Sequence, residues 1–374
     1  VKSNMKIIFI GFLLRILFSY FNTIFGPYSG AEYDAISFHN EAIRFTENLE
    51  FSDKLGWFYA DIIGIIYLLS FNSIFIGSLV SIFSWVVSAI VILKLLKKFN
   101  FEDRIINVIL IAYVFLPSSI FITSITLREG MILLFINLIA LSFAKYELEK
   151  RALNIFIILL LFIALIFFHK AYVINAAFVF PLLLIILLFS INNRLLFYLS
   201  SLFLILLLFP FITYINDLSI SKDFYDTNTI FYTNISNFKS ALTISRATYE
   251  INYEINNFIG FLFFAPLTFF RYLFEPMPWR VSSFYDVILF FENCLRFFLI
   301  YLAITKLNKI NYKTFYFVLF FYFLTELIWS FGTSNWGTAA RHHLPSYGLL
   351  LLIAFFPNYK FNHSNKNYKQ STRI

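Results

Sequence analysis

Long apolar blocks alternate with short polar segments along this chain. The clearest apolar blocks cover 6–25, 74–95, 105–124, 131–146, 153–168, 171–190, 194–213, 284–304, 312–331 and 344–356. A helix needs about 20 mainly apolar residues to cross the hydrocarbon core of a bilayer. Transmembrane β-barrels have short segments of alternating hydrophobicity instead, and these blocks are continuously apolar. The pattern predicts an all-α fold, a polytopic bundle of ten transmembrane helices.

Two weaker stretches, 57–71 and 258–274, are short or interrupted by polar residues. They contain Asp61 and Arg271, and Glu275 follows closely. We expect them to form re-entrant or interfacial helices on the outer face. If both crossed the membrane, the bundle would have twelve spans.

The distribution of basic residues favours ten spans. Lysine and arginine in short loops tend to remain cytoplasmic. With the N-terminus inside, ten spans place one set of basic residues on the cytoplasmic side: Lys94, Lys97, Lys98, Arg104, Lys145, Lys150, Arg151, Arg194, Lys306, Lys309, Lys313, Lys360, Lys366, Lys369 and Arg373. Twelve spans would invert most of these loops. We therefore expect a multi-pass protein of the bacterial cytoplasmic membrane with both termini inside.

The same topology places the chemically varied segments on the outer face. They are the loops 26–56, 214–257 and 332–343, the Arg128-Glu129 turn, His169-Lys170 and the segment 276–280. We expect residues 1–357 to form a single transmembrane domain. Residues 358–374 form a polar cytoplasmic tail that we expect to be disordered. The first span follows Lys2 and Lys6 without a small-residue cleavage site before Gly26, so we expect it to be retained.

Composition agrees with this class of protein. The 374 residues are 60% hydrophobic and 13% charged, with a mean hydropathy of +0.77. The net charge of +8 comes from loop and tail residues, so it reports topology rather than nucleic-acid binding. The single cysteine, Cys294, excludes an internal disulfide and a cysteine-based metal site.

The first outer loop holds an unusual polar cluster between Ser29 and Glu41. Ser29 and Glu32 have the spacing of a capping box, in which each side chain satisfies a backbone N–H at a helix start. On a continuous helix Asp34 and Glu41 share one face, while Glu32 and His39 share another. The segment therefore predicts an amphipathic helix at the interface, with its apolar residues on the membrane. Asp34 is either a catalytic or ligand-binding carboxylate or part of a solvated helix face.

Two further outer segments carry arginine. Arg128 and Glu129 either form a local ion pair at a helix end or present a guanidinium to a phosphate. Arg341 and His342 follow a loop made flexible by glycine, which favours either anion binding or an interfacial anchor. His343 comes next, and adjacent histidines point in different directions on a helix, so a paired metal site is disfavoured.

Three more polar features lie near or within the spans. Pro276 and Pro278 break any helix and deliver Arg280 to the outer face. Glu292 and Arg296 have the spacing of an intrahelical ion pair, which we expect to be structural. Glu326 has no obvious partner in its span, so we expect it to face a polar cavity.

Common nucleotide-binding and hydrolase motifs are missing from the sequence. It has no Walker loop, no GxGxxG, no GxSxG elbow and no HExxH. ATP-driven transport and nucleotide-sugar chemistry in a soluble fold are therefore disfavoured.

The plan of the chain resembles the membrane glycosyltransferases of the GT-C superfamily and the related O-antigen-type polysaccharide polymerases. The resemblance is carried by Glu32-Tyr33-Asp34 after the first span, by the Arg128-Glu129 turn, and by the Gly/Trp/Arg/His loop before the last span. In GT-C enzymes an acidic motif in the first outer loop supplies the catalytic base, and Glu32 and Asp34 match it. Some members possess a large soluble C-terminal domain, which we do not expect in this chain.

The resemblance implies transfer or polymerisation of sugars from a polyprenyl-linked donor to a glycan or lipid acceptor. Asp34, or else Glu32, would then be the base. Substrate-binding residues would be His39, Glu41, Arg128, Glu129, Arg280, Arg341 and His342, with the arginines on the leaving phosphate. The resemblance makes no cofactor certain, and a divalent metal held by the carboxylates and the lipid phosphate is the one cofactor it allows. The alternative is a lipid-linked oligosaccharide flippase or other secondary transporter, with Glu326, Glu292 and Arg296 lining its pathway.

Overall fold

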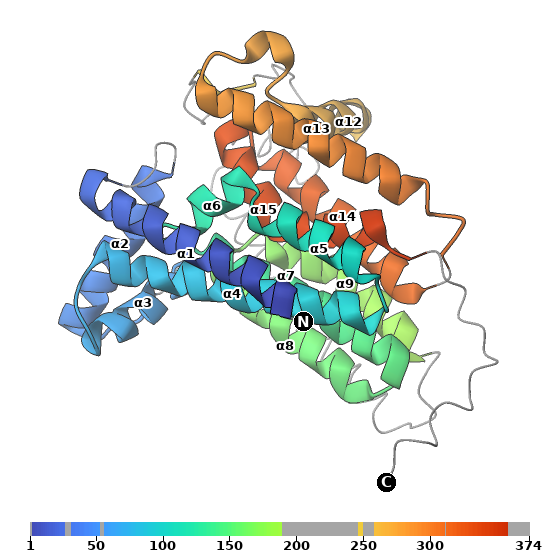
Figure 1. Cartoon of the computed structure of the whole chain (residues 1–374), viewed down its shortest axis with the longest axis horizontal. Coiled ribbons are helices and arrows are strands. Elements are labelled where there is room, and N and C mark those ends of the chain that lie inside the picture. Colours follow the sequence, from blue (N-terminus) through green and yellow to red (C-terminus); the bar gives the residue numbers. More distant parts are fainter. Residues whose placement is uncertain are drawn as a thin grey trace, which may run out of the picture.

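The computed structural model describes residues 2–26, 31–52, 56–188, 246–249, 258–310 and 312–357. The expected span 194–213, most of the loop 214–257 and the tail from 358 lie outside these ranges. Within them the regular elements are all helices, apart from one antiparallel bridge between Thr248 and Asn335. The all-α expectation is therefore confirmed for the described part of the chain (Figure 1).

Five described helices are long and apolar enough to cross a membrane. They are α1 (Lys2–Phe25), α4 (Ile74–Lys98), α7 (Glu129–Glu149), α13 (Phe284–Ile304) and α14 (Lys313–Phe331). Two shorter apolar helices, α8 (Ala152–Phe168) and α9 (Tyr172–Leu188), follow α7. These helices are compatible with a membrane protein, and they match the positions of the predicted blocks.

The predicted span 105–124 is broken in the structure. It forms α5 (Asp103–Val114) and α6 (Pro117–Thr123), which meet at an angle of 55° and together would make a sixth candidate span. The break coincides with Pro117. Proline lacks an N–H donor and disfavours the helical conformation of the residue before it, here Leu116.

The predicted loop 332–343 is wrong for most of its length. Helix α15 (Trp336–Phe355) begins eight residues before the expected span 344–356. Asn335 explains the early start, because its side chain accepts hydrogen bonds from the N–H groups of Gly337 and Thr338. Such an N-cap satisfies donors that the first turn of a helix leaves unpaired. Arg341 and His342 therefore lie on a helix rather than on a flexible loop.

The amphipathic helix predicted in the first loop is present as α2 (Glu32–Asn48). Its buried residues, Ala35, Phe38, Ala42 and Phe45, lie on one face. The rings of Phe38 and Tyr59 are 5.3 Å apart, so this face packs on α3 (Phe58–Leu68). Tyr33, the second residue of α2, is 87% exposed. In Figure 1, α2 and α3 lie at the left, beyond the start of α4.

Helix α2 starts without a side-chain cap, and helix α3 is short. Ala31 is the N-cap of α2 and makes no side-chain cap; the predicted capping box involves Ser29, which lies outside the described residues. Helix α3 has 11 residues, a length of about 16 Å at 1.5 Å per residue. It is too short to cross a bilayer, as expected for the stretch 57–71.

The ends of the helices gather in two groups. At the end that we call the basic end, Lys98 pairs with Glu149, and Lys306 donates to the Phe356 carbonyl. Glu147 of α7 accepts from the backbone N–H groups of Lys313 and Thr314, which caps α14. Many basic residues predicted to be cytoplasmic occur here.

At the opposite end, the polar end, α4, α7 and α15 begin, and α6, α8 and α14 finish. Gly56, between α2 and α3, donates to the Phe167 carbonyl of α8. Thr126, just before α7, donates to the Ile74 carbonyl of α4. Segments expected on the outer face therefore meet at one end of the bundle.

Segments 246–249 and 275–286 pack against the start of α15 at the polar end, and we call these two segments the clasp. Helix α12 (Phe258–Phe274) leads through a 3-10 turn, Pro278–Arg280, into α13. The described segment 246–249 pairs with the start of α15, because Tyr249 donates to the Ser334 carbonyl and Trp336 donates to the Ala247 carbonyl. The Trp336 indole also donates to Asp286 of α13, at 2.9 Å.

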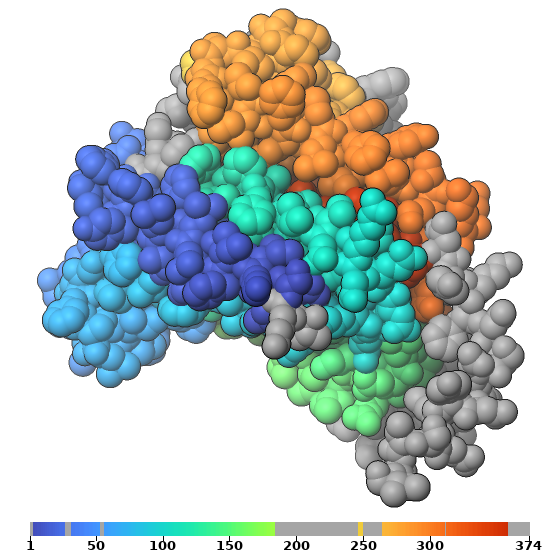
Figure 2. All heavy atoms as spheres, in the orientation of Figure 1, coloured from blue at the N-terminus to red at the C-terminus, as the bar shows by residue number. Residues whose placement is uncertain are grey.

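A buried arginine joins α1 to the broken helix. Arg15 is fully buried and donates to the side chains of Thr123 and Ser119 and to the carbonyl of Val114. Its guanidinium also lies 3.4 Å from the centroid of a Trp85 ring. The helix break frees the Val114 carbonyl, and Arg15 satisfies it. Figure 2 shows α1 and α5 side by side on one face of the molecule.

Candidate functional site

Arg341 lies at the centre of a charged cluster at the polar end. Its Nη1 lies 2.5 Å from Asp34 Oδ2, and its Nη2 lies 2.7 Å from Glu129 Oε1. Nε donates to the same Glu129 oxygen at 3.1 Å. The side chain of Arg341 is only 9% exposed. One guanidinium therefore binds carboxylates from α2 and α7, both far from it in sequence.

The two carboxylates have different environments. The Asp34 side chain is 56% exposed, whereas that of Glu129 is 5% exposed. Asp34 is placed in the first turn of α2 by the packing of Phe38 and Ala35 on α3. Glu129 is the first residue of α7. Asp34 is therefore the carboxylate of the pair that a solute can reach, while Glu129 supports Arg341 from the interior.

A close contact between α4 and α7 sets the position of Glu129. Gly130 lies so near α4 that a Cβ atom on it would come within 2.7 Å of the Ser81 carbonyl oxygen. A side chain at this position would push the two helices apart. Glycine thus allows the start of α7 to approach α4 and fixes the depth of the cluster.

Arg128 lies beside the cluster and has a guanidinium N–H group without a described hydrogen-bond partner. Its Nη1 donates to the Gly56 carbonyl at 2.8 Å, and its guanidinium lies 5.5 Å from the Phe38 ring centroid. Its Nε is buried and has no partner among the described residues. Arg128 also interacts electrostatically with Glu129, Arg341 and Asp34. Unlike Arg341, it makes no described ion pair within 4 Å, so it can accommodate an anion.

Histidine and tryptophan side chains line the cluster on its interior side. The rings of His342 and Trp329 stack at 3.8 Å, and His169 meets Trp329 edge-on at 4.5 Å. His169 Nδ1 accepts from the N–H of Ala171, so the neutral ring carries its hydrogen on Nε2. Burial, reinforced by the positive charge of Arg128, lowers the pKa of His169 well below 6.5. His169 is therefore a neutral hydrogen-bond donor beside two arginines.

Three predicted site residues of α2 do not join the cluster. Glu32 is exposed at the first position of the helix. Glu41 pairs with Arg44 one turn further along. His39 Nδ1 lies 2.8 Å from the Tyr67 hydroxyl, which itself donates to the Ser73 carbonyl. Of the acidic motif, only Asp34 reaches Arg341.

Arg280 also stays apart from the cluster, in the clasp. It pairs with Glu275 at 2.9 Å and donates to the Thr248 carbonyl at 2.7 Å. Its guanidinium lies 5.1 Å from a Trp336 ring centroid. These contacts hold segment 246–249 against the start of α15, which is a structural role.

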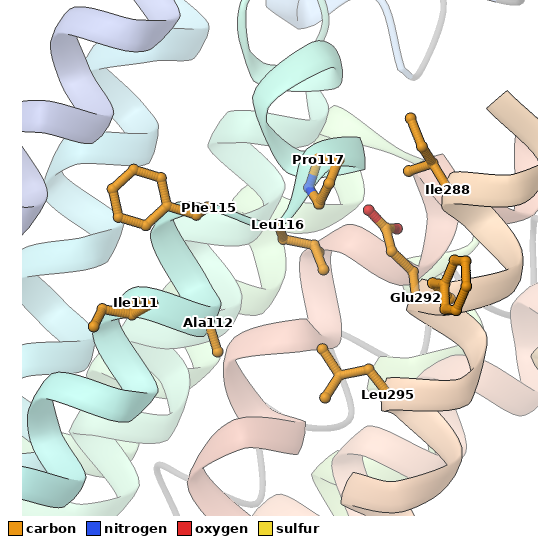
Figure 3. A pocket seen from close by; sticks show the side chains of 9 residues that line it. Ile111, Ala112, Phe115, Leu116, Pro117, Ile288, Glu292 and Leu295 are labelled. Carbon is orange, nitrogen blue, oxygen red and sulfur yellow. The ribbon is translucent and has the colours of Figure 1, made fainter. Parts of the chain in front are cut away.

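The expected pair of Glu292 and Arg296 is not formed. Glu292 accepts from the Ser118 N–H at 2.8 Å, which caps the start of α6, whereas Arg296 donates to the Leu273 carbonyl and to Asn293. The turn at Pro117 places a free N–H closer to Glu292 than the arginine. Figure 3 shows Glu292 pointing toward Pro117 across a cavity of about 430 Å³ lined mainly by apolar side chains of α5 and α13.

Glu326 has a partner, contrary to expectation. Its carboxyl group meets His343 of α15 at 2.5 Å and accepts from the Ser346 hydroxyl. The sequence did not reveal this pair, because the two residues lie on separate helices. As expected, His342 and His343 point to different neighbours. No group of three or more potential metal ligands occurs within the described ranges.

His169 and Trp329 join the cluster although the sequence does not mark them as site residues. The only signal was their position, since each lies near the end of a predicted span that closes at the outer face. No family model, curated protein or solved structure matches the chain.

Proposed function

We propose that the chain transfers or polymerises sugars from a polyprenyl-linked donor at the outer face of the bacterial cytoplasmic membrane. The observation that carries the proposal is Arg128, which has an unpaired donor beside the Asp34–Arg341–Glu129 cluster. Arginine offers planar donors that suit phosphate oxygens. A long apolar bundle capped at one end by such a cluster suits a substrate with a lipid tail and a phosphorylated head.

In this proposal Asp34 is the general base. It would take the proton of an acceptor hydroxyl as that oxygen attacks the anomeric carbon of the donor sugar. The bond from the anomeric carbon to the phosphate oxygen breaks, and the phosphate leaves with the bonding electron pair. The exposed carboxylate of Asp34 is accessible to an acceptor from the aqueous side.

Arg128 would bind the leaving phosphate, whose charge grows in the transition state. Arg341 would hold Asp34 in position, because it is already engaged by two carboxylates. His169 would donate a hydrogen bond from Nε2 to the same phosphate. Glu32, His39, Glu41 and Arg280 have no direct part in this scheme, since none of them lies in the cluster.

The orientation in the membrane is part of the proposal. The polar end would face outward and the basic end inward, in keeping with the retention of lysine and arginine on the cytoplasmic side. Helices α2 and α3 would lie at the outer interface. The total number of spans would be ten.

Sugar transfer in membranes tests the assignment of Asp34. Membranes that contain the Asp34→Asn variant are expected to lose transfer from a lipid-linked donor, because an amide does not accept the proton. Glu47→Gln, an exposed change on the same helix, is the matched control and should transfer normally. Normal transfer by Asp34→Asn at a wild-type protein level would refute the assignment.

A further inference from the structure

A buried acid–base pair lies between α14 and α15, away from the proposed reaction. Glu326 is fully buried and His343 is 5% exposed. His343 Nδ1 lies 2.5 Å from Glu326 Oε2. Ionisable residues inside apolar helices are costly to insert, and in membrane proteins they often mark proton or ion pathways. Neither residue has a role in the sugar transfer described above.

The hydrogen bonds determine how many protons the pair holds. His343 Nε2 lies 3.0 Å from the carbonyl oxygen of Tyr272. A carbonyl can only accept, so Nε2 carries a hydrogen. The contact between Nδ1 and Glu326 Oε2 then requires one more hydrogen, because a carboxylate and a ring lone pair would repel. The pair thus holds one proton more than a carboxylate and a neutral imidazole would.

The surroundings favour the uncharged form of the pair. Arg296 of α13 interacts electrostatically with His343 and opposes a second positive charge there. An ion pair in this apolar interior would also have to overcome the desolvation of both charges. The other titratable or charged groups of the helices around the pair are Tyr172, Tyr272, Glu292, Tyr322, Arg341, His342 and Tyr347. We therefore assign the proton to Glu326 and a neutral ring to His343.

Tyr172 connects the pair to the polar end. Its ring centroid lies 6.1 Å from that of Trp329, which is one helical turn from Glu326 on α14, and 6.5 Å from that of His169 at the polar end. Its side chain is fully buried between these two ends. A hydroxyl can accept one proton and donate another, so it can relay a proton between the two groups.

Two further phenols could support such a relay. The hydroxyls of Tyr272 and Tyr322 are buried without a described partner, and both interact electrostatically with Glu326. Buried polar groups are usually satisfied by protein or by ordered water. Several unpaired hydroxyls around one carboxyl group indicate a site that water can bridge.

We propose that Glu326 and His343 form an internal proton-binding site that exchanges its proton with the polar end through Tyr172. A proton leaves Glu326 Oε2 by way of the Tyr172 hydroxyl to water, and another returns by the same route. The pair is uncharged before and after each exchange. The ligand of this site is a proton, with water as its carrier.

Infrared spectroscopy of the purified protein in liposomes tests where the proton resides. The wild type should show a protonated carboxyl band that moves when H2O is replaced by D2O. Glu326→Gln should lack this band, and its amide can still donate to His343 Nδ1, which preserves the contact. Glu292→Gln is the control and should retain the band. Identical carboxyl spectra for the wild type and Glu326→Gln would overturn the proposal.

The rate of deuteration tests the route. Tyr172→Phe should slow exchange of the Glu326 band by about tenfold, the effect of losing one relay step of about 1.4 kcal/mol. Tyr347→Phe removes a comparable buried phenol that interacts with Glu292 and Arg296 instead, and it should exchange like the wild type. Equal rates in all three proteins, or a wild-type band that never exchanges, would contradict the relay. These readouts do not depend on sugar transfer.

Discussion

Arg341 and Asp34 are 307 positions apart in the sequence, yet Arg341 Nη1 lies 2.5 Å from Asp34 Oδ2. The contact joins α15 to α2, and Glu129 adds α7 to the same guanidinium. The cluster therefore forms only when the early and late parts of the chain have packed together. Its chemistry and its contribution to stability are linked.

Loss of the Arg341 guanidinium should destabilise the bundle. Arg341→Met would leave Glu129 buried without its cation, and breaking a buried pair in this way costs about 3–5 kcal/mol. We expect a large fall in the thermal unfolding temperature of the protein in detergent. Arg44→Met, which breaks the exposed pair with Glu41, should cost at most about 1 kcal/mol. An equal fall in the unfolding temperature of both variants would contradict the central position of Arg341.

Arg15 should be needed for the docking of α1. Arg15→Met would remove three buried hydrogen bonds to Thr123, Ser119 and Val114, each worth about 1.5–3 kcal/mol because the donor is charged. Lysine should not rescue the site, since one ammonium does not reproduce the planar donors or the stacking on Trp85. Limited proteolysis of α1 measures the effect. Wild-type protection in the methionine variant would show that Arg15 is dispensable.

The neutral state of His169 predicts a pH dependence of stability. Its pKa in the folded protein lies well below the usual 6.5 because the ring is buried. The unfolded chain therefore binds a proton between these two pKa values while the folded protein does not. Stability should be unaffected by His169 above pH 6.5, and should fall as the pH is lowered below it, by up to about 1.4 kcal/mol per pH unit.

His169→Asn is the matched variant for this effect. The amide oxygen of asparagine can accept from the Ala171 N–H in place of Nδ1, but asparagine does not titrate. Thermal unfolding between pH 7 and pH 5 should show a shallower decline for the variant. The same slope in both proteins would mean that His169 is protonated in the folded state.

The proposed orientation predicts where a reporter would be found. A reporter fused after Asn100, at the basic end between α4 and α5, should give a cytoplasmic signal. A fusion at His169, at the polar end, should give an external one. The reverse pattern would contradict the assignment of the polar end to the outer face.

The sequence predicted helices well where apolar blocks are continuous. Helices α13 and α14 occur almost where the blocks 284–304 and 312–331 place them, since a long apolar run leaves few alternatives. The start of α15 was missed because its polar first turns look like a loop, although Asn335 caps a helix there. The break at Pro117 was missed because the block 105–124 as a whole is apolar enough to form one span.

The candidate site was predictable in composition but not in its pairing. Asp34, Arg128 and Arg341 were singled out because charged residues beside apolar blocks are unusual. The sequence could not show that Arg280 pairs with Glu275, or that Glu326 meets His343, because these contacts depend on how separate segments pack. Local spacing suggested Glu292 with Arg296, and a backbone donor at the helix break proved to be the partner of Glu292.

Binding of a short-chain polyprenyl phosphate to the purified protein tests the central claim most directly. Arg128→Gln should weaken binding by about 10- to 100-fold, the loss of one charge-assisted hydrogen bond to a phosphate. Arg44→Gln, an exposed arginine on α2, should bind as tightly as the wild type. Equal affinity of the wild type and Arg128→Gln would contradict the account of the polar-end cluster as a lipid-phosphate site.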